Sequence, residues 1–327
     1  MTTRATLPEQ AGAVLVAAEA VRLLHEAGVP SSALHLVPGA GEVGARLVEH
    51  PSVAGVVFTG STEVARLIHR ALAAKDGPIV PLIAETGGIN AMIVDATALP
   101  EQVADDVVTS AFRSAGQRCS ALRLLLVQED VAERMIAMIV GAARELRIGD
   151  PRDPATQLGP VIDAEAKARL DVHVARMKRE ALRTWHAGKA PPGLYVAPHV
   201  FELDRPAALA EEVFGPILHV VRYRADRLED VLEAIEATGY GLTLGIHSRI
   251  DATVEVVIKH LSVGNVYVNR NMIGAVVGVQ PFGGHGLSGT GPKAGGPHNL
   301  LRFATEQTVT VNTAAAGGNA MLLVMEE

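Results

Sequence analysis

The sequence contains a single cysteine, Cys119, in the segment Ser-Ala-Gly-Gln-Arg-Cys-Ser at residues 114–120. A lone cysteine is most often a small buried apolar residue. The neighbours of Cys119 are polar and typical of a turn, however, which favours an active-site loop. Arg118 and the adjacent backbone N–H groups can favour the thiolate, which can attack a carbonyl carbon and form a covalent intermediate. One cysteine excludes an internal disulfide or a cysteine-based metal site, and we expect no metal site.

A carboxylate that can serve such a cysteine follows the apolar residues 81–84. Glu85 begins the segment Glu-Thr-Gly-Gly-Ile-Asn at 85–90. Parallel α/β folds place their sites at strand ends, so Glu85 is a candidate general base. The alternative for Glu85 alone is a solvated glutamate at the end of a strand.

Three further segments have the residue types of ligand sites. In Phe-Thr-Gly-Ser-Thr-Glu at 58–63 a strand ends, Gly60 permits close approach, and Ser61 can cap a helix whose N-terminus attracts phosphate. No Gly-x-Gly-x-x-Gly is present here, and a plain capped helix explains the pattern equally well. Ordinary turns likewise explain Glu-Glu-Val-Phe-Gly-Pro at 211–216 and the Gly/Pro-rich segment 281–297.

The elements that must hold these segments alternate between strand and helix along the chain. Apolar runs predict strands at 34–37, 53–58 and 79–84, which we expect to be neighbours in a parallel sheet that places Glu85 near Cys119. Apolar residues at helical spacing predict the helices between them, at 11–27, 41–49 and 61–73. The chain opens on a helix where a nucleotide-binding domain normally opens on a strand, so the sheet starts late.

The same alternation continues in the second half of the chain. Further strands are expected at 122–127, 263–269 and 305–312. Asp130 is expected to cap a helix that runs to about residue 146, and Asp226 to cap one that ends at Gly239. The tail at 314–319 is small and polar, and we expect it to be loosely ordered.

Composition bounds the class of protein. The 327 residues are 48% hydrophobic and 20% charged with a net charge of −7, which is typical of a globular chain with a sizeable core. Without a Lys/Arg run, a nucleic-acid partner is excluded. No window approaches the ~18 apolar residues of a membrane span, and Glu9 and Gln10 stand where a signal peptide is basic. We therefore expect a cytoplasmic enzyme.

Four motifs in order resemble the aldehyde dehydrogenase superfamily over essentially the whole chain. They are Glu-Thr-Gly-Gly at 85–88, Gly-Gln-x-Cys at 116–119, Glu-x-Phe-Gly-Pro at 212–216 and Pro-Phe-Gly-Gly-x-Gly-x-Ser-Gly at 281–289. The longer segments 84–91, 116–123, 289–297 and 311–320 look like the dehydrogenase module of the bifunctional proline-utilisation proteins.

The resemblance implies an α/β, aldehyde dehydrogenase-like fold in three parts. Residues 1–88 would be an incomplete Rossmann-type NAD-binding domain, and residues 89–288 the α/β catalytic domain with the cysteine. Residues 289–327 would supply a substrate-anchor loop and a C-terminal oligomerisation strand.

The resemblance also implies an activity, the NAD-dependent oxidation of L-glutamate γ-semialdehyde (1-pyrroline-5-carboxylate) to L-glutamate. Cys119 would form a thiohemiacetal and then, after hydride transfer to NAD, a thioester, and Glu85 would activate the hydrolytic water. Contacts to the cofactor are expected from Glu9, Gly60, Ser61, Glu212 and Phe214. The substrate carboxylate would be held by Ser120, Gly295 and Gly296.

Two departures from the family pattern lie near the start of the sequence. An upstream Pro-Trp-Asn-Phe-like segment, whose Asn completes the oxyanion hole, has no counterpart, and Thr-Leu-Pro-Glu-Gln at 6–10 lacks the family's lysine. We therefore expect a cofactor sheet without its first two strands, weak NAD binding and slow turnover. The partners would be a small aldehyde substrate and either further copies of this chain or a complementary N-terminal half. A non-catalytic, truncated remnant or the assembly partner of a split enzyme stays open as the alternative.

Overall fold

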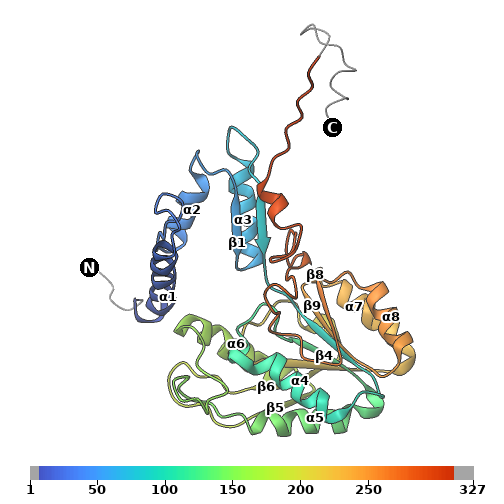
Figure 1. Cartoon of the computed structure of the whole chain (residues 1–327). Coiled ribbons are helices and arrows are strands. Elements are labelled where there is room, and N and C mark those ends of the chain that lie inside the picture. Colours follow the sequence, from blue (N-terminus) through green and yellow to red (C-terminus); the bar gives the residue numbers. More distant parts are fainter. Residues whose placement is uncertain (1–6, 313–327) are drawn as a thin grey trace.

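A computed structural model describes residues 7–312 of the chain, with side chains from residue 13 onward. Its larger part is a seven-stranded sheet in the order β10-β9-β3-β4-β7-β6-β5 (Figure 1). The strands are β3 (Ala91–Val94), β4 (Leu124–Gln128), β5 (Arg183–His186), β6 (His199–Leu203), β7 (Ile217–Tyr223), β9 (Thr243–His247) and β10 (Asn265–Val268). Every neighbouring pair is parallel except β5 with β6. The fold is therefore α/β, as predicted.

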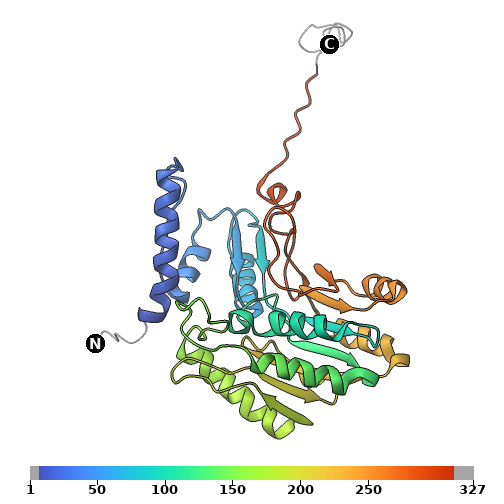
Figure 2. The same ribbon diagram turned by 60° about the horizontal axis from the view of Figure 1, so that its bottom comes forward.

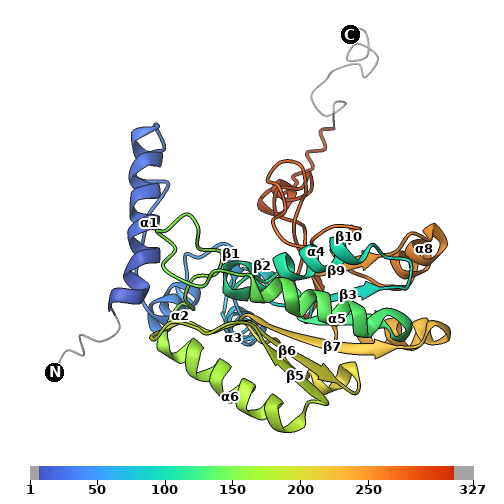
Figure 3. The same ribbon diagram turned by 90° about the horizontal axis from the view of Figure 1, so that it is seen from below.

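Helices cover both faces of this sheet. On β7, Arg222 donates to Glu133 of α5 (Glu129–Arg144), whereas His219 contacts His173 of α6 (Ala164–Glu180). Because residues 219 and 222 point to opposite faces of one strand, α5 and α6 lie on opposite faces of the sheet. Helix α4 (Pro100–Phe112) lies beside α5 (Figure 3). Helices α7 (Leu228–Glu236) and α8 (Asp251–His260) lie near the short strand β8 (Tyr240–Gly241) and near β9 (Figure 1).

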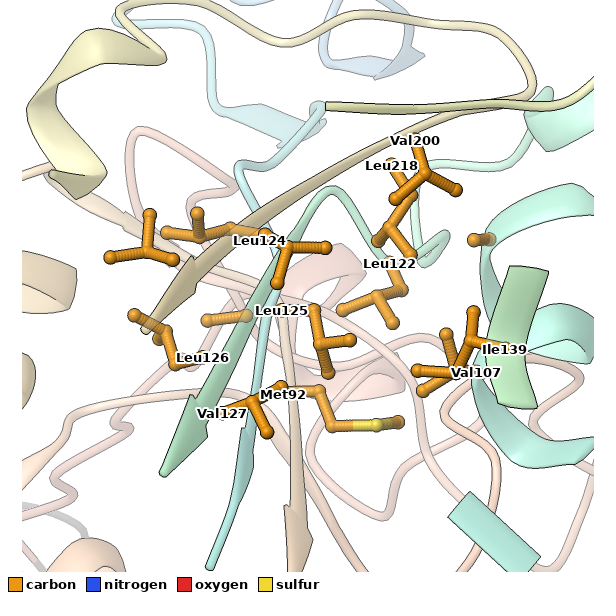
Figure 4. Packing of buried hydrophobic residues seen from close by; sticks show 14 of the residues in the cluster. Met92, Val107, Leu122, Leu124, Leu125, Leu126, Val127, Ile139, Val200 and Leu218 are labelled. Atoms are coloured by element: carbon orange, nitrogen blue, oxygen red, sulfur yellow. The ribbon is translucent and has the colours of Figure 1, made fainter. Parts of the chain in front are cut away.

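The central strands are apolar on both faces because both faces are covered. In β4 the residues Leu124, Leu125, Leu126 and Val127 are all fully buried. Figure 4 shows them packing with Met92 of β3 and with side chains from the helices. The result is one continuous core that fixes the position of the loop preceding β4.

A smaller layer precedes the seven-stranded sheet. Strands β1 (Val56–Thr59) and β2 (Leu82–Glu85) form a parallel pair in which Val56 lies opposite Leu82, and α3 (Thr62–Ala73) connects them. Helices α1 (Leu7–Glu26) and α2 (Gly41–Glu49) lie beside this layer (Figure 2). The parallel pairing of the second and third predicted strands is thus confirmed.

Two predicted strands are wrong within this chain. Residues 34–37 are not in a strand, because β1 pairs with β2 alone and no strand among the described residues pairs with that segment. Residues 305–312 are exposed and extend away from the body of the molecule without a neighbouring strand (Figure 1). Pairing of this segment with another subunit stays a prediction, and the tail expected to be loosely ordered at 314–319 lies outside the described residues.

Helix caps were predicted with mixed success. Ser61 caps α3 by accepting a hydrogen bond from the Val64 N–H at 3.2 Å, as expected. The caps expected from Asp130 and Asp226 are wrong. The Asp130 carboxylate accepts from Gln128, and that of Asp226 from Arg224, because a nearby side-chain donor competes with the helix N–H groups. None of the helices between residues 7 and 312 is long and apolar enough to cross a membrane.

A pair of buried histidines joins α6 to the sheet. The Nε2 atoms of His173 and His219 lie 2.9 Å apart, and His219 Nδ1 lies 3.1 Å from the carbonyl oxygen of Arg123. A carbonyl only accepts, so His219 Nδ1 carries the proton and His173 Nε2 must donate to His219 Nε2. This order of protons requires both rings to be neutral.

We expect this pair to make the fold sensitive to acid. Burial lowers the pKa of His173 to about 4 and that of His219 to about 3, whereas an unfolded histidine has a pKa of about 6.5. Below pH 6.5 the unfolded chain therefore takes up protons that the native chain does not, and the free energy of unfolding falls by roughly 2 kcal/mol or more between pH 7 and 5. Urea unfolding at both pH values measures the loss. The double variant H173L/H219L should show a flatter pH dependence, and replacement of the exposed His50 by leucine should leave it unchanged.

Candidate active site

The segment before Cys119 is an unusual turn between α4 and β4. Ser114, Ala115 and Gly116 all have left-handed backbone angles, with φ of 58°, 54° and 65°. At Gly116 the turn lies directly on another loop, because a Cβ there would be 2.1 Å from the carbonyl oxygen of Gly215. The nucleophile loop, residues 114–120, is therefore packed tightly against residues 211–216.

Asn90 fixes the backbone on the other side of Cys119. Its Nδ2 donates to the carbonyl oxygens of Cys119 at 2.6 Å and Ala121 at 2.9 Å, and its Oδ1 accepts from the Thr243 N–H at 3.2 Å. The sequence analysis gave Asn90 no role. The sequence signal for Asn90 is its position, because it is the polar residue between the Glu-Thr-Gly-Gly segment and the apolar run at 91–94.

The Cys119 side chain is partly exposed, and its surroundings oppose ionisation of the thiol. Burial raises the pKa of Cys119 above its ordinary value, and the carboxylates of Glu212 and Glu85 raise it further. The Ser120 N–H and the N–H of Cys119 itself favour the thiolate, as expected. Arg118 is not among the groups that shift the pKa of Cys119, and its Nε donates to Ser114 Oγ at 3.1 Å.

Glu85 is at the end of β2, where a loop from the C-terminal region encloses it. The Gly284 N–H donates to Oε2 at 3.3 Å, while Oε1 is buried and has no hydrogen-bond partner in the part of the chain that the structure describes. Burial raises the pKa of Glu85 to about 7, and the Gly284 N–H and the charge of Lys293 oppose this rise. A group with this pKa changes protonation near neutral pH, as a general base must. The alternative of a solvated glutamate does not fit this environment.

The residues predicted to contact the cofactor are distributed over several elements. Gly60 and Ser61 are exposed at the start of α3, and the ring of Phe214 is 46% exposed. Glu9 is within α1, but its side chain lies outside the described part of the chain. An exposed helix N-terminus and an exposed aromatic ring suit a pyrophosphate and a nicotinamide ring.

Glu212 points inward in this structure. Its carboxylate lies 3.4 Å from a guanidinium nitrogen of Arg123 and accepts from the Gly88 N–H. A Cβ at Gly87 would be 1.7 Å from Glu212 Oε2, so only glycine leaves room for this contact. Burial raises the pKa of Glu212, and the charge of Arg123 opposes the rise. Sequence reasoning placed Glu212 in the site but missed Arg123.

The residues predicted to bind the substrate carboxylate lie on two segments. Ser120 is buried next to Cys119, and its carbonyl oxygen accepts from Thr243 Oγ1 at 3.2 Å. Gly295 and Gly296 belong to the same loop as Lys293, which contacts Gly264. Their joint role in binding a carboxylate stays a prediction.

Comparison with known proteins identifies the class to which this site belongs. The family model described as "Aldehyde dehydrogenase family" matches residues 8–309. The chain belongs to the aldehyde dehydrogenase family. The family match and the mostly parallel α/β sheet agree with the resemblance found in the motifs.

Within the family, the similarity is to proline-catabolic proteins. The chain is 54% identical over 301 residues to the bifunctional protein PutA of Salmonella typhimurium and 39% identical over 303 residues to a 1-pyrroline-5-carboxylate dehydrogenase of Geobacillus kaustophilus. These alignments cover 88% and 90% of this chain, but only 23% and 58% of the relatives.

Solved structures give the same pattern. A variant of proline utilization A from Bradyrhizobium japonicum is 77% identical with a TM-score of 0.90, over 92% of this chain and 31% of that one. A 1-pyrroline-5-carboxylate dehydrogenase from Thermus, solved with bound NAD, is 38% identical with a TM-score of 0.84, over 89% and 57%. The chain thus spans less than two thirds of the length of these relatives.

Proposed function

We propose that this chain carries the NAD-dependent oxidation of L-glutamate γ-semialdehyde, in equilibrium with 1-pyrroline-5-carboxylate, to L-glutamate in proline catabolism. The observation that supports it most is that the partly exposed Cys119 lies close enough to Glu85 for the Glu85 charge to raise the pKa of the thiol, while burial raises the pKa of Glu85 itself to about 7. The names of the relatives supply the substrate. The surroundings of Cys119 and Glu85 support the type of reaction.

The first half of the reaction forms a carbon–sulfur bond. The Cys119 thiol must lose its proton before Sγ attacks the aldehyde carbon, because the thiolate is the nucleophile. Ionised Glu85 is the carboxylate that can take this proton. The tetrahedral thiohemiacetal then loses a hydride from carbon and becomes a thioester on Sγ.

The second half cleaves the thioester. Once Glu85 has released the thiol proton to solvent, a water molecule adds to the thioester carbonyl carbon while Glu85 accepts its proton, and the Cys119 thiolate leaves. The product is a carboxylate, so the aldehyde carbon has been oxidised by two electrons. When bound, NAD would accept the hydride, with the start of α3 at Ser61 receiving the pyrophosphate and Phe214 lying beside the ring. Glu212 would have to turn away from Arg123 to reach a ribose.

An assay of NADH formation tests this function. The purified chain with NAD and glutamate semialdehyde should produce NADH, and hexanal, an aldehyde without a carboxylate, should be a poorer substrate by kcat/KM. Activity that does not distinguish the two aldehydes would remove the substrate assignment. No NADH with either aldehyde would favour the alternative, a non-catalytic assembly partner.

A further inference from the structure

Arg123 is the largest fully buried side chain among the described residues, yet it carries a permanent charge. Its Nη1 donates to the carbonyl oxygen of Gly215 at 3.1 Å, and its Nη2 donates to that of Arg118 at 3.1 Å. Arg118 immediately precedes the nucleophile, and Gly215 belongs to residues 211–216. One guanidinium therefore binds both loops of the site.

The same guanidinium is the counter-charge of Glu212. Nη2 lies 3.4 Å from Glu212 Oε1, and the planar group lies over the ring of Phe214 at 5.3 Å from its centroid. A buried charge is costly without a partner, and removal of one member of a buried pair leaves the other uncompensated. The position of Glu212 next to Cys119 thus depends on Arg123.

The backbone of Arg123 is held as firmly as its side chain. Its N–H donates to the Asn90 carbonyl at 3.0 Å, and its carbonyl oxygen accepts from the N–H of His219 at 2.9 Å. The His219 ring also donates to this oxygen. The Arg123 backbone is bound to Asn90, directly before β3, and to His219 of β7. The guanidinium therefore holds both loops in a fixed position relative to the sheet.

We propose that Arg123 is a positioning residue of the active site, which fixes the nucleophile loop against residues 211–216 and holds the Glu212 carboxylate beside Cys119. This role rests on the site of the proposed function and deepens it. Lysine cannot replace arginine here, because an ammonium lacks the planar fork that reaches two carbonyl oxygens at once.

The charges around Cys119 make this role measurable. Glu212 and Glu85 oppose ionisation of the thiol, whereas the Arg123 guanidinium and the Cys119 thiolate attract each other. The Arg118 guanidinium donates to Ser114 Oγ. Removal of Arg123 leaves the Glu212 charge uncompensated next to the sulfur. The thiolate should then form only at higher pH.

Iodoacetamide labelling tests the proposal, since Cys119 is the single cysteine of the chain. We expect R123M to shift the pH midpoint of labelling upward by about one unit, which makes labelling about tenfold slower below the midpoint. The variant R123K keeps the charge but not both carbonyl contacts. It should keep a midpoint close to wild type, while amide hydrogen exchange in residues 114–120 becomes faster.

Two further variants separate this role from a general loss of stability. In R123M/E212Q the midpoint should return toward that of the wild type, because both charges are gone. R222M removes an arginine of the same sheet that pairs with Glu202, far along β7 from the nucleophile loop, and should change neither measurement.

A folded R123M with an unchanged midpoint would overturn the proposal. If R123M does not fold, exchange in R123K decides: native protection at residues 114–120 refutes the positioning role, and faster exchange supports it. Labelling and exchange need neither cofactor nor aldehyde. The result therefore stands apart from any failure of the proposed dehydrogenase activity.

Discussion

Replacement of Glu85 by glutamine should slow both halves of the proposed reaction near neutral pH, and at high pH, where hydroxide can ionise the thiol, it should leave the acyl group on Cys119. Glutamine is nearly isosteric and still accepts the Gly284 N–H, but it cannot take a proton from water. Loss of a general base typically costs 10²–10⁴-fold in rate, so thioester hydrolysis should slow by about this factor. If the first half can draw on another base, such as hydroxide at high pH, the acyl-enzyme accumulates.

Two measurements detect this intermediate. Rapid mixing of E85Q at pH 9 with NAD and the aldehyde should give a burst of one NADH per chain followed by a slow phase, and intact-protein mass spectrometry should show one added acyl group. In the wild type, hydrolysis should slow as the pH falls below about 7, because Glu85 becomes protonated there. The exposed Glu145 is a matched control, and E145Q should behave as the wild type. Unchanged steady-state turnover in E85Q would exclude Glu85 as the base.

Replacement of Cys119 by alanine should abolish the oxidation altogether. Sγ forms the covalent bond in every step, and loss of a nucleophile can cost about 10⁶-fold, as in serine proteases. The sulfur is partly exposed and its removal leaves no buried charge, so the fold should keep its stability. The expected result is NADH formation at background level in a folded protein.

Binding measurements on C119A distinguish loss of the nucleophile from a change in the cofactor site. Calorimetry with NAD should give the same dissociation constant for C119A and the wild type, because the residues proposed to hold the cofactor are elsewhere. Residual turnover above background in C119A would contradict the covalent route. A serine in place of Cys119 should be nearly as inactive, since its hydroxyl is a much weaker nucleophile near neutral pH.

The sequence predicts the two candidate reacting residues, Cys119 and Glu85, but not the contacts that hold them. Cys119 and Glu85 were found because each stands in a short ordered motif, and residue types and spacing are visible in a sequence. The inward position of Glu212 depends on Arg123, which is 89 residues away along the chain, and no local pattern reports such a contact. Burial of Arg123 was equally hidden, since arginine is normally exposed.

The errors in secondary structure have the same origin. The segments 34–37 and 305–312 have the composition of strands, but a strand exists only with a hydrogen-bonded neighbour, and none is present among residues 7–312. Aspartate is a favoured N-cap residue, but the carboxylates of Asp130 and Asp226 accept hydrogen bonds from Gln128 and Arg224 instead. The cap predicted at Ser61 was confirmed.

The close backbone approaches at Gly87 and Gly116 bear on attempts to engineer this site for other aldehydes. Any side chain at Gly116 meets the carbonyl of Gly215, and any side chain at Gly87 meets the carboxylate of Glu212. The segments around Gly87, Gly116 and 211–216 therefore restrict one another's sequences, because there is no space for a side chain at either glycine. A library that randomises one loop at a time will mostly contain variants whose new side chain clashes with the unchanged neighbouring loop. Coordinated changes at 87, 116 and 211–216 allow a different set of mutually compatible residues. Specificity should be sought first in side chains outside these contacts.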